Sequence, residues 1–396
     1  MTLYNAKVKT LVGDKNITVE VFKNYDDLII DFLSDISKQI FNNKRSKNFP
    51  DLISFAFWIR KSNLILNKNK RSNSNALGLG LVFHIPPSNI PLNFAYSFVF
   101  GLIGGNSNIV RVPNKKNEQT EILINILKKT LKRKKYNKIF KTNLLIKYDH
   151  DFEINKFYSE NSDCRLIWGG DETINEFKKY TTKPTNIDIL FPDKYSLSII
   201  NSEKLRNISK NEIKKLVKNF FNDTYLFDQN ACTAPHLIIW TGNSIKFAKK
   251  IFWNNLIIFL KTNYKYNNFI SVKKYSTLLK HFTKLNNIEY HKKDSNVLYR
   301  IGIKKLSINI DKFKGFAGIF FEYSTNETND LKKIVNRRFQ TLLYYGYEKE
   351  ILKKIVLKNN FKGIDRIVPI GKGLDMNFLW DGYNLDNILS REIEIK

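Results

Sequence analysis

Residues 77–112 read LGLGLVFHIPPSNIPLNFAYSFVFGLIGGNSNIVRV. The apolar run Leu77–Ile85 is typical of a short buried strand. A Pro-rich turn leads from it into an apolar segment that begins at Leu92 and ends at two consecutive glycines, and Asn108–Val112 then has the composition of a second strand. A strand, a helix and a second strand in this order predict a βαβ unit and therefore a parallel sheet.

The alternation of strands and helices continues along the chain. The expected elements are a helix over Glu118–Lys135, strands over Leu144–Tyr148 and Cys164–Trp168, a helix that begins at Asp171, an amphipathic helix opened by the capping box Ser209–Glu212, and a strand over Arg366–Ile370. Upstream, the expected elements are strands over Ala6–Phe22, a helix over Tyr25–Phe41 and an exposed loop over Lys61–Asn75. The pattern predicts an α/β fold.

The composition excludes several classes of protein. The chain has 396 residues, enough for two or three domains of about 100–200 residues. With 42% hydrophobic and 14% aromatic residues it is not globally disordered, and its 17 Gly and 9 Pro exclude a collagen-like chain. Two Cys cannot form a disulfide framework or a four-Cys zinc site, and the five His show no metal-ligand spacing, so we expect no metal.

No segment has the features of a targeting peptide or of a membrane span. The first twelve residues lack an apolar core followed by a cleavage site. The longest apolar stretches, Leu92–Ile103 and Ile251–Leu260, are shorter than the ~18–20 residues that a bilayer span needs. We therefore expect a cytoplasmic protein with reduced thiols.

The chain is strongly basic, with 66 Lys and Arg against 37 Asp and Glu and a formal net charge of +29. This charge raises the alternative of a nucleic-acid-binding protein. The excess is mostly Lys and is spread along the chain, and its densest run, Lys128–Lys138, is interpreted as a solvated helix end, with a polyanion site as the other interpretation. We expect no nucleic-acid partner, although the positive field should steer a nucleotide cofactor or CoA to the protein.

Cys232 lies in the segment FDQNACTAP, which is rich in small and polar residues. A thiolate is the strongest nucleophile that a protein offers at neutral pH, so this position is a candidate for covalent catalysis. From position alone, a small buried residue is the alternative. Cys164 falls within a strand-like run and is expected in the core.

Two turns that follow strands are candidate ligand sites. In IPPSNIP, the prolines hold Asn89, whose amide could stabilise a developing oxyanion, close a turn or cap the following helix. Gly169 and Gly170 either let the backbone approach a ligand or form a plain tight turn. The G-x-G-x-x-G fingerprint and the Walker A motif are both absent, and His84 and His236 are expected to be structural.

Taken together and in this order, these segments resemble the aldehyde dehydrogenase superfamily. The resemblance is closest to its bacterial long-chain acyl-CoA (acyl-protein thioester) reductase branch, which is LuxC-like and includes the reductase subunit of the fatty acid reductase complex of luminous bacteria. The segments are IPPSNIP (85–91), GGNSNIVRVP (104–113), WGGDET (168–173), FPDKYS (191–196), FDQNACTAP (227–235), RFQT (338–341), RIVPIG (366–371) and WDG (380–382). The resemblance covers nearly the whole chain from about residue 77.

The resemblance implies an aldehyde-dehydrogenase-like α/β architecture with an open parallel-sheet cofactor domain and a second α/β catalytic domain. We place an N-terminal region and the cofactor-binding domain in residues 1–223, the catalytic domain in 224–350, and a C-terminal segment that packs back on the body in 351–396. It further implies that Cys232 accepts the acyl group and that Asn89 shares the oxyanion hole with the backbone N–H of Cys232. The cofactor-binding positions that it implies are Pro87, Arg111 (with Lys115 as the alternative), Gly169, Gly170, Thr173 and Glu322.

The implied activity is the NAD(P)H-dependent reduction of a fatty acyl thioester, acyl-CoA or acyl-protein, to the aldehyde through an acyl-cysteine. The cofactor would be NADPH or NADH. Aldehyde-oxidising members of the superfamily carry a Glu-Leu-Gly-Gly segment whose Glu activates water, whereas the corresponding stretch here is Tyr195–Ser198, without a carboxylate. Because water attack on the acyl-enzyme needs such a base, its absence favours a reductase.

The resemblance also bears on partners. Acyl-transferase and acyl-protein synthetase subunits would supply or activate the acyl group, and association through sheets, common in the superfamily, makes a homo-oligomer an open alternative. An enzyme of the same fold that acts on a smaller aldehyde or acyl-CoA in another pathway is the second hypothesis, and a basic nucleic-acid-binding protein is the distant third.

Overall fold

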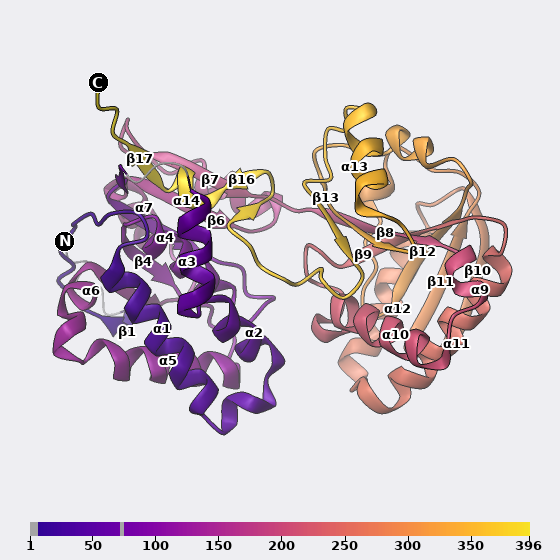
Figure 1. The fold of residues 1–396 in the computed structure, drawn as a ribbon, viewed down its shortest axis with the longest axis horizontal. Coiled ribbons are helices and arrows are strands. Elements are labelled where there is room, and N and C mark those ends of the chain that lie inside the picture. Colours follow the sequence, from indigo (N-terminus) through magenta and orange to yellow (C-terminus); the bar gives the residue numbers. More distant parts are fainter. Residues whose placement is uncertain (1–6, 72–74) are drawn as a thin grey trace. The chain divides into compact units, whose positions relative to one another are not determined.

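The computed structural model describes residues 7–71 and 75–396 and divides them into two compact units (Figure 1). The first unit contains the described residues up to Pro192 together with Met376–Lys396, and the second is Asp193–Asp375. The expected boundary at residue 223 falls inside the second unit. The reason is β8 (Tyr195–Asn201), which pairs with strands of the second sheet and so takes residues 193–223 into that unit.

The first unit is built on a six-stranded sheet in the order β1-β5-β4-β3-β6-β7. Its strands are β1 (Lys9–Gly13), β3 (Leu81–Ile85), β4 (Ser107–Arg111), β5 (Asn143–Lys147), β6 (Cys164–Trp168) and β7 (Ile187–Phe191). All pairs are parallel except β1 with β5. Because β4 and β5 extend from one side of β3 while β6 and β7 extend from the other, the strand order reverses between β3 and β6, and ligands bind at such a switch point, outside the carboxyl ends of the strands.

Helices flank this sheet; those expected over residues 25–41, from 92, over 118–135 and from 171 are confirmed, and the others were not predicted. The helices are α1 (Asp27–Asn42), α2 (Pro50–Trp58), α3 (Lys61–Lys70), α4 (Asn93–Ile103), α5 (Glu118–Leu131), α6 (Asn137–Thr142), α7 (Phe152–Asn161), α8 (Asp171–Phe177) and α14 (Leu385–Ile388). The exposed loop expected over 61–75 is wrong where α3 forms, and residues 72–74 of that expectation lie outside the described part of the chain. Leu64 is fully buried there, and Lys61 and Lys68 pair with Asp31 and Asp27 of α1, so tertiary contacts stabilise a helix of polar composition.

Two strand predictions in the first unit also need correction. The expected strands over 6–22, whose first residue lies outside the described part of the chain, reduce to β1. The single strand expected over 77–85 is two strands, β2 (Ala76–Gly78) and β3. Gly80 separates them with a φ of +135°, a conformation that only glycine adopts readily.

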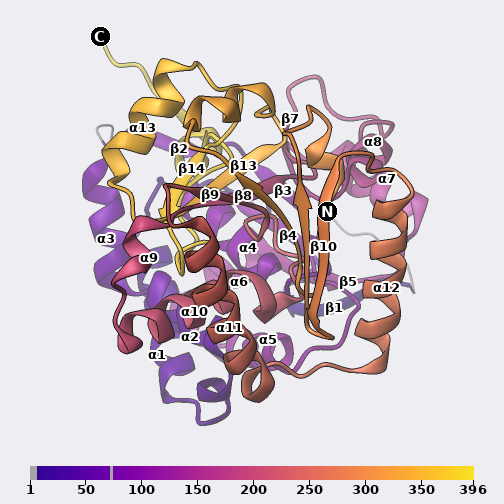
Figure 2. The same cartoon turned by 90° about the vertical axis from the view of Figure 1, so that its right-hand side faces the viewer.

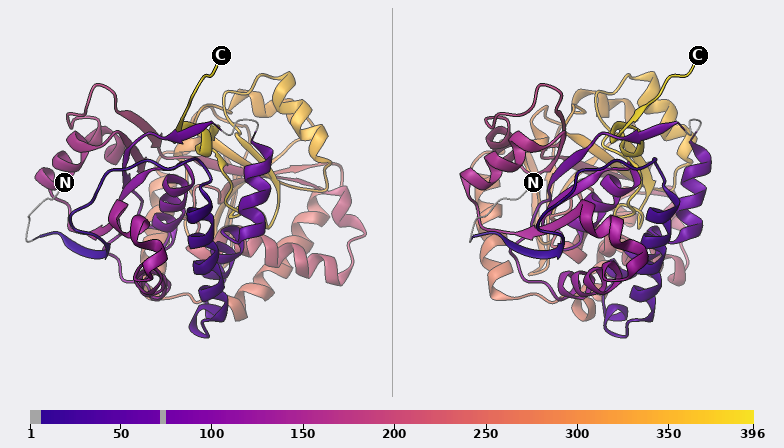
Figure 3. Two further views of the ribbon diagram at one scale, coloured as in Figure 1. Left: turned by 60° about the vertical axis from the view of Figure 1, so that its left-hand side comes forward. Right: turned by 90° about the vertical axis from the view of Figure 1, so that its left-hand side faces the viewer.

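The C-terminal residues complete the first unit. β17 (Ser390–Glu392) pairs with β2 in antiparallel fashion, and the yellow C-terminal segment lies along the purple strand in Figure 3. β15 (Leu379–Trp380) and β16 (Tyr383–Asn384) form a short hairpin. The side chain of Asn106 donates to the carbonyl of Leu389 at 2.7 Å, which ties this segment to the turn before β4.

The second unit contains a seven-stranded sheet in the order β10-β11-β12-β9-β8-β13-β14. Besides β8, its strands are β9 (Pro235–Thr241), β10 (Ile288–Ser295), β11 (Leu298–Ile303), β12 (Ile319–Ser324), β13 (Phe339–Tyr345) and β14 (Arg366–Pro369). Only the edge strand β10 runs antiparallel to its neighbour; the described pairs among the other strands are parallel (Figure 2).

Helices cover both faces of this second sheet. They are α9 (Glu203–Arg206), α10 (Lys210–Thr224), α11 (Ile245–Asn263), α12 (Asn268–Phe282) and α13 (Lys349–Lys358). The predicted capping box of α10 is confirmed, since Ser209 accepts from the backbone of Glu212 and Glu212 accepts from that of Ser209. Apolar residues of α10 and α11 pack on one face of the sheet, while Leu278 of α12 and Leu352 of α13 pack on the other.

Candidate active site

Cys232 lies in the loop that enters the central strand β9 of the second unit. The loop follows a turn of 3-10 helix, Tyr225–Phe227, and ends at Pro235, the first residue of β9. The side chain of Cys232 is half-buried, whereas Ala231 and Thr233 on either side are buried. The sulfur is therefore carried by an anchored loop at the amino end of a buried strand.

The side chain of Gln229 holds this loop in shape. Its amide nitrogen donates to the carbonyl of Pro235 at 3.0 Å and to that of Ile319 at 3.1 Å, and its amide oxygen accepts from the N–H of Gly318 at 3.1 Å. Gln229 is 2% exposed and has a φ of +62°, which a residue other than glycine adopts only where its surroundings fix it. The buried amide of Gln229 thus joins the two ends of the loop around Cys232 and binds the loop to the segment 318–319.

Two polar side chains from neighbouring strands contact Cys232 directly. The Nε2 of Gln340, on β13, lies 3.5 Å from the sulfur and donates to it. The hydroxyl of Ser196, on β8, donates to the carbonyl of Cys232 at 2.7 Å and accepts from the backbone N–H of Thr341 at 3.2 Å. The amide N–H stabilises a thiolate more than a thiol, because hydrogen bonding to the charged form favours it.

Cys164 differs from Cys232 in its burial and in its surroundings. It lies on β6, fully buried, and burial raises the pKa of its thiol far above the ordinary value. A buried thiol of this kind is chemically inert. The prediction that Cys164 is a core residue is confirmed, and Cys232 is the more accessible of the two thiols.

His236 follows Cys232 by four residues and has a structural role, as predicted. Its ring is 3% exposed, and its Nδ1 accepts from the backbone N–H of Gly315 at 3.1 Å. Burial holds its pKa well below the usual range, so the imidazole is neutral and serves as an acceptor.

In the first unit, the candidate cofactor residues lie at the carboxyl ends of adjacent strands. Pro87 and Asn89 follow β3, with Asn89 exposed, and Gly169 and Gly170 follow β6. Because β3 and β6 are hydrogen-bonded neighbours at the point where the strand order reverses, both turns lie at the place where open α/β sheets bind ligands. The sequence had placed these turns separately, and the sheet brings them together.

The two glycines after β6 differ in what surrounds them. A Cβ on Gly169 would lie 2.9 Å from the Cβ of Thr173, whereas a Cβ on Gly170 would meet no atom within 4 Å. Gly170 is also the N-cap residue of α8, without a capping side chain. Gly169 is therefore required by packing against Thr173, and Gly170 leaves open space beside the backbone.

Arg111 ends β4, the strand next to β3. Its guanidinium carbon lies 4.6 Å from the centre of the Tyr148 ring, which orients the half-buried side chain. Lys115, the alternative position, is exposed in the loop after β4. Arg111 is thus the better-ordered cation at this edge of the sheet.

A buried polar network behind these turns was not predicted. Ser97 of α4 contacts the Nδ1 of His84 at 2.8 Å and accepts from the indole N–H of Trp168 at 3.2 Å, and the Nε2 of His84 contacts Asn108 at 2.9 Å. Burial lowers the pKa of His84 to about 4. Ser97 therefore links the ends of β3 and β6 through one hydroxyl, and its only mark in the sequence is that it is a polar residue in an apolar helix.

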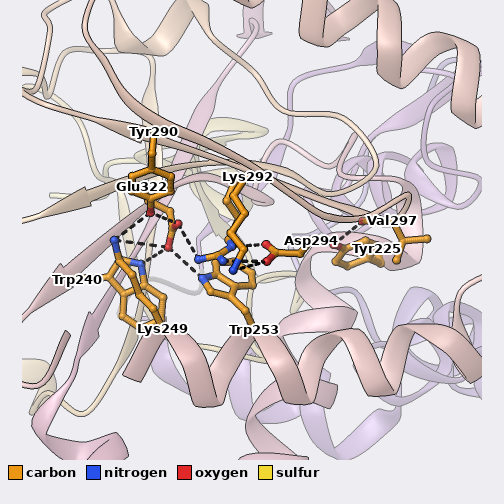
Figure 4. Close-up of polar contacts among 10 residues, drawn as sticks. Tyr225, Trp240, Lys249, Trp253, Tyr290, Lys292, Asp294, Val297 and Glu322 are labelled. Atoms are coloured by element: carbon orange, nitrogen blue, oxygen red, sulfur yellow. Dashed lines mark hydrogen bonds and ion pairs between the residues drawn. The ribbon is translucent and has the colours of Figure 1, made fainter. Parts of the chain in front are cut away.

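Glu322, the predicted ribose-binding residue, lies on β12 of the second unit and is 1% exposed. Its Oε1 accepts from the indole N–H groups of Trp240 at 2.7 Å and Trp253 at 3.0 Å. Its Oε2 accepts from the Tyr290 hydroxyl, as Figure 4 shows, and from Arg300 at 3.3 Å. Both carboxylate oxygens are engaged by side chains of the same unit, and these contacts favour a structural role for Glu322 over cofactor binding.

Residues 7–71 and 75–396 contain no group of three or more His, Cys, Asp and Glu side chains that could hold a metal ion. Each helix of that same part of the chain is too short or too polar to cross a lipid bilayer.

Comparison with known proteins gave one family match and many structural ones. A family model described as acyl-CoA reductase (LuxC) matches residues 56–257. No curated protein matches the sequence. Among solved structures, a variant of proline utilization A from Bradyrhizobium japonicum has a TM-score of 0.64 at 10% identity, covering 92% of this chain and 42% of that one. The chain thus spans less than half the length of the proline utilization A structures that it matches.

Two shorter enzymes match over most of their length. An NAD-dependent benzaldehyde dehydrogenase from Corynebacterium glutamicum has a TM-score of 0.60 at 11% identity, with 93% of this chain and 82% of that chain covered. A glyceraldehyde-3-phosphate dehydrogenase from Methanocaldococcus jannaschii, complexed with NADP, has a TM-score of 0.61 at 14% identity, with 92% and 88% covered. At these identities the likeness concerns the fold, which is that of the aldehyde dehydrogenases, as the sequence predicts.

Proposed function

Because the chain belongs to the acyl-CoA reductase (LuxC) family, we propose that it reduces a fatty acyl thioester to the aldehyde by way of an acyl-cysteine at position 232. The family makes the protein an oxidoreductase that forms or acts on aldehydes. The observation that carries the proposal is the position of Cys232, half-buried on a fixed loop with the amide of Gln340 directed at its sulfur.

The first half-reaction is acyl transfer. The Cys232 thiolate attacks the thioester carbonyl, a carbon–sulfur bond forms, and the tetrahedral intermediate expels the donor thiol, which takes up a proton. The resemblance assigns stabilisation of the oxyanion to the amide of Asn89 and the backbone N–H of Cys232. The hydrogen bond from Ser196 to the carbonyl of Cys232 keeps that stretch of backbone in place.

The second half-reaction releases the aldehyde. A reduced nicotinamide dinucleotide, when bound, supplies a hydride to the acyl carbonyl carbon. The thiohemiacetal alkoxide that forms on Cys232 collapses to the aldehyde as its carbon–sulfur bond breaks, which returns the thiolate. Overall, one thioester, one reduced dinucleotide and one proton give one aldehyde, one thiol and one oxidised dinucleotide.

The edge of the first sheet fits a dinucleotide. The open space beside Gly170 lets a ligand approach the backbone, and Arg111 provides an ordered cation for an adenosine ribose or its 2′-phosphate. Pro87 and Thr173 border the same two turns. We propose NADPH, with NADH as the alternative, because a cation at this edge suits a phosphorylated ribose.

The stretch that replaces the superfamily's water-activating segment supports reduction over oxidation. Tyr195–Ser198 lies on β8, and Ser196 contacts the Cys232 loop with a hydroxyl rather than a carboxylate. Without a base on this stretch, hydrolysis of the acyl-enzyme should be slow, and the acyl group persists until it is reduced or transferred to a thiol.

Mass spectrometry of the intact protein after incubation with acetyl-, octanoyl- and tetradecanoyl-CoA tests the proposal. We expect the mass of one acyl group on the wild type and on Cys164→Ala, and none on Cys232→Ala. Addition of NADPH should remove the label and release aldehyde. Acylation of Cys232→Ala would show that the nucleophile lies elsewhere, and turnover confined to acetyl-CoA would favour the smaller-substrate alternative.

A further inference from the structure

Helix α12 of the second unit has apolar side chains on two opposite faces. The inner face buries Ile270 and Leu278. The outer face exposes Phe269 by 74%, Val272 by 67%, Tyr275 by 60% and Leu279 by 47%. These four side chains follow one another at intervals of three or four residues and so form one stripe. We call this set the α12 stripe; large apolar residues gathered on one exposed face mark an interaction surface.

The charge around the α12 stripe has a single sign. Residues 264–288, which run from the end of α11 through α12 to β10, contain five Lys, no Arg and no acidic residue. Lys273 and Lys280 are exposed on the helix itself, and Lys284 is exposed just after it. Glu289, on the edge strand β10, is the first acidic residue that follows.

The edge strand adds to the positive charge on the same side of the sheet. The rings of Phe282, at the end of α12, and His291, on β10, lie 4.8 Å apart, and Figure 2 shows the two elements side by side. Lys293 of β10 is exposed, and its Nζ lies 5.8 Å from the ring of Tyr299. The buried Lys274 of α12 approaches that same ring at 4.7 Å, so Lys293 lies on the α12 side.

Three kinds of occupant could cover such a stripe: a second copy, an acidic protein or an anionic lipid surface. A second copy would set Lys273 and Lys280 against lysines of a chain that also carries a net charge of +29, and like charges repel. The stripe lies on a single helix and combines aromatic and aliphatic side chains with flanking lysines. Helices that lie in a bilayer interface have this pattern.

We propose that the α12 stripe docks the protein on the surface of an anionic lipid bilayer. Phe269, Val272, Tyr275 and Leu279 enter the boundary between headgroups and acyl chains, while the flanking lysines contact lipid phosphates. This inference rests on the surface of the second unit and does not depend on the proposed reductase activity.

Sedimentation of the full-length protein with large unilamellar vesicles tests the inference. The vesicles are phosphatidylcholine alone or phosphatidylcholine with 30 mol% phosphatidylglycerol, in 50 and 300 mM NaCl. We expect the anionic vesicles to bind at least about tenfold more tightly at the lower salt concentration, because each lysine near the surface contributes to the attraction. The test variant is Phe269→Ser with Leu279→Ser, and we expect it to weaken that binding by at least about tenfold.

The matched control is Phe247→Ser with Ile258→Ser on α11. These side chains are also exposed, by 47% and 66%, but α11 packs on the other face of the sheet. The control should bind like the wild type, and thermal unfolding checks that all variants fold. Equal binding to both vesicles, equal binding by all variants, or a change of oligomeric state in the α12 variant without loss of vesicle binding would each overturn the proposal.

Discussion

Gln340 and Cys232 are 108 positions apart in the sequence, yet the amide nitrogen of Gln340 donates to the sulfur of Cys232 at 3.5 Å. The amide is fully buried, so it points at the sulfur in a fixed direction. A donor in this position stabilises the thiolate, and a charge in the same position would act on the thiol more strongly than the hydrogen bond does.

Replacing Gln340 with Glu should therefore suppress the reactivity of Cys232. A carboxylate so close to the sulfur disfavours the thiolate and so raises the pKa of the thiol. The measurement is the rate of iodoacetamide alkylation of Cys232 against pH, with Cys232→Ala as the blank. We expect the midpoint to move up in Gln340→Glu and the rate at pH 7 to fall about tenfold. An unchanged profile would mean that Gln340 does not act on the thiol.

Ser196 should stabilise the same loop by its hydrogen bond to the backbone of Cys232, and not by a contact with the sulfur. Ser196→Ala removes the donor to the Cys232 carbonyl and the acceptor for the N–H of Thr341. Leaving such buried groups unpaired costs about 1–3 kcal/mol of unfolding free energy. Urea denaturation measures this loss, and acylation by acyl-CoA should slow as well. Ser244→Ala, at the half-buried N-cap of α11, where the hydroxyl donates to the exposed Glu203, is the control, and equal effects of the two changes would contradict the assignment.

The buried His84 predicts a loss of stability in mild acid. Its pKa is about 4 in the folded protein and about 6.5 when unfolded, so the unfolded chain binds the proton more readily. The contribution of the neutral ring to the free energy of unfolding is complete above pH 6.5 and is lost as the pH falls toward 4. At pH 5 the loss in the free energy of unfolding is about 2 kcal/mol. His84→Gln should flatten this part of the pH dependence of urea unfolding, whereas His291→Gln, on the edge strand, should leave it nearly as steep.

Much of the framework could be predicted from the sequence because its signals are local. The capping box at Ser209 and the strand–turn–helix around IPPSNIP depend on neighbouring residues, and both form as expected. The α3 helix could not be predicted in this way, because its polar sequence is stabilised by Asp27 and Asp31 of another helix. Local signals fail where the deciding contact is with a distant part of the chain.

In the candidate sites, too, some residues are marked by the local sequence and others are brought in by the fold. The motif around Cys232 marks a nucleophile position, but the residues that control it, Gln340 and Ser196, come from strands far away in the sequence. Glu322 shows the reverse case. Its match to a cofactor-binding Glu is a sequence argument, and the two indoles and the arginine that engage its carboxylate become visible only in the folded sheet.

Gly170 offers the sharpest test of the proposed cofactor site, because a Cβ there would meet no atom within 4 Å. Its φ of −65° is compatible with any L-residue, so Gly170→Ala and Gly170→Leu should both fold like the wild type. If a dinucleotide occupies that space, Gly170→Leu should raise the KM for NADPH about tenfold or more while acylation of Cys232, followed by mass spectrometry, stays normal. Gly169→Leu is the contrasting variant, since its side chain collides with Thr173 and should lower the melting temperature. Normal NADPH kinetics in Gly170→Leu would place the cofactor elsewhere.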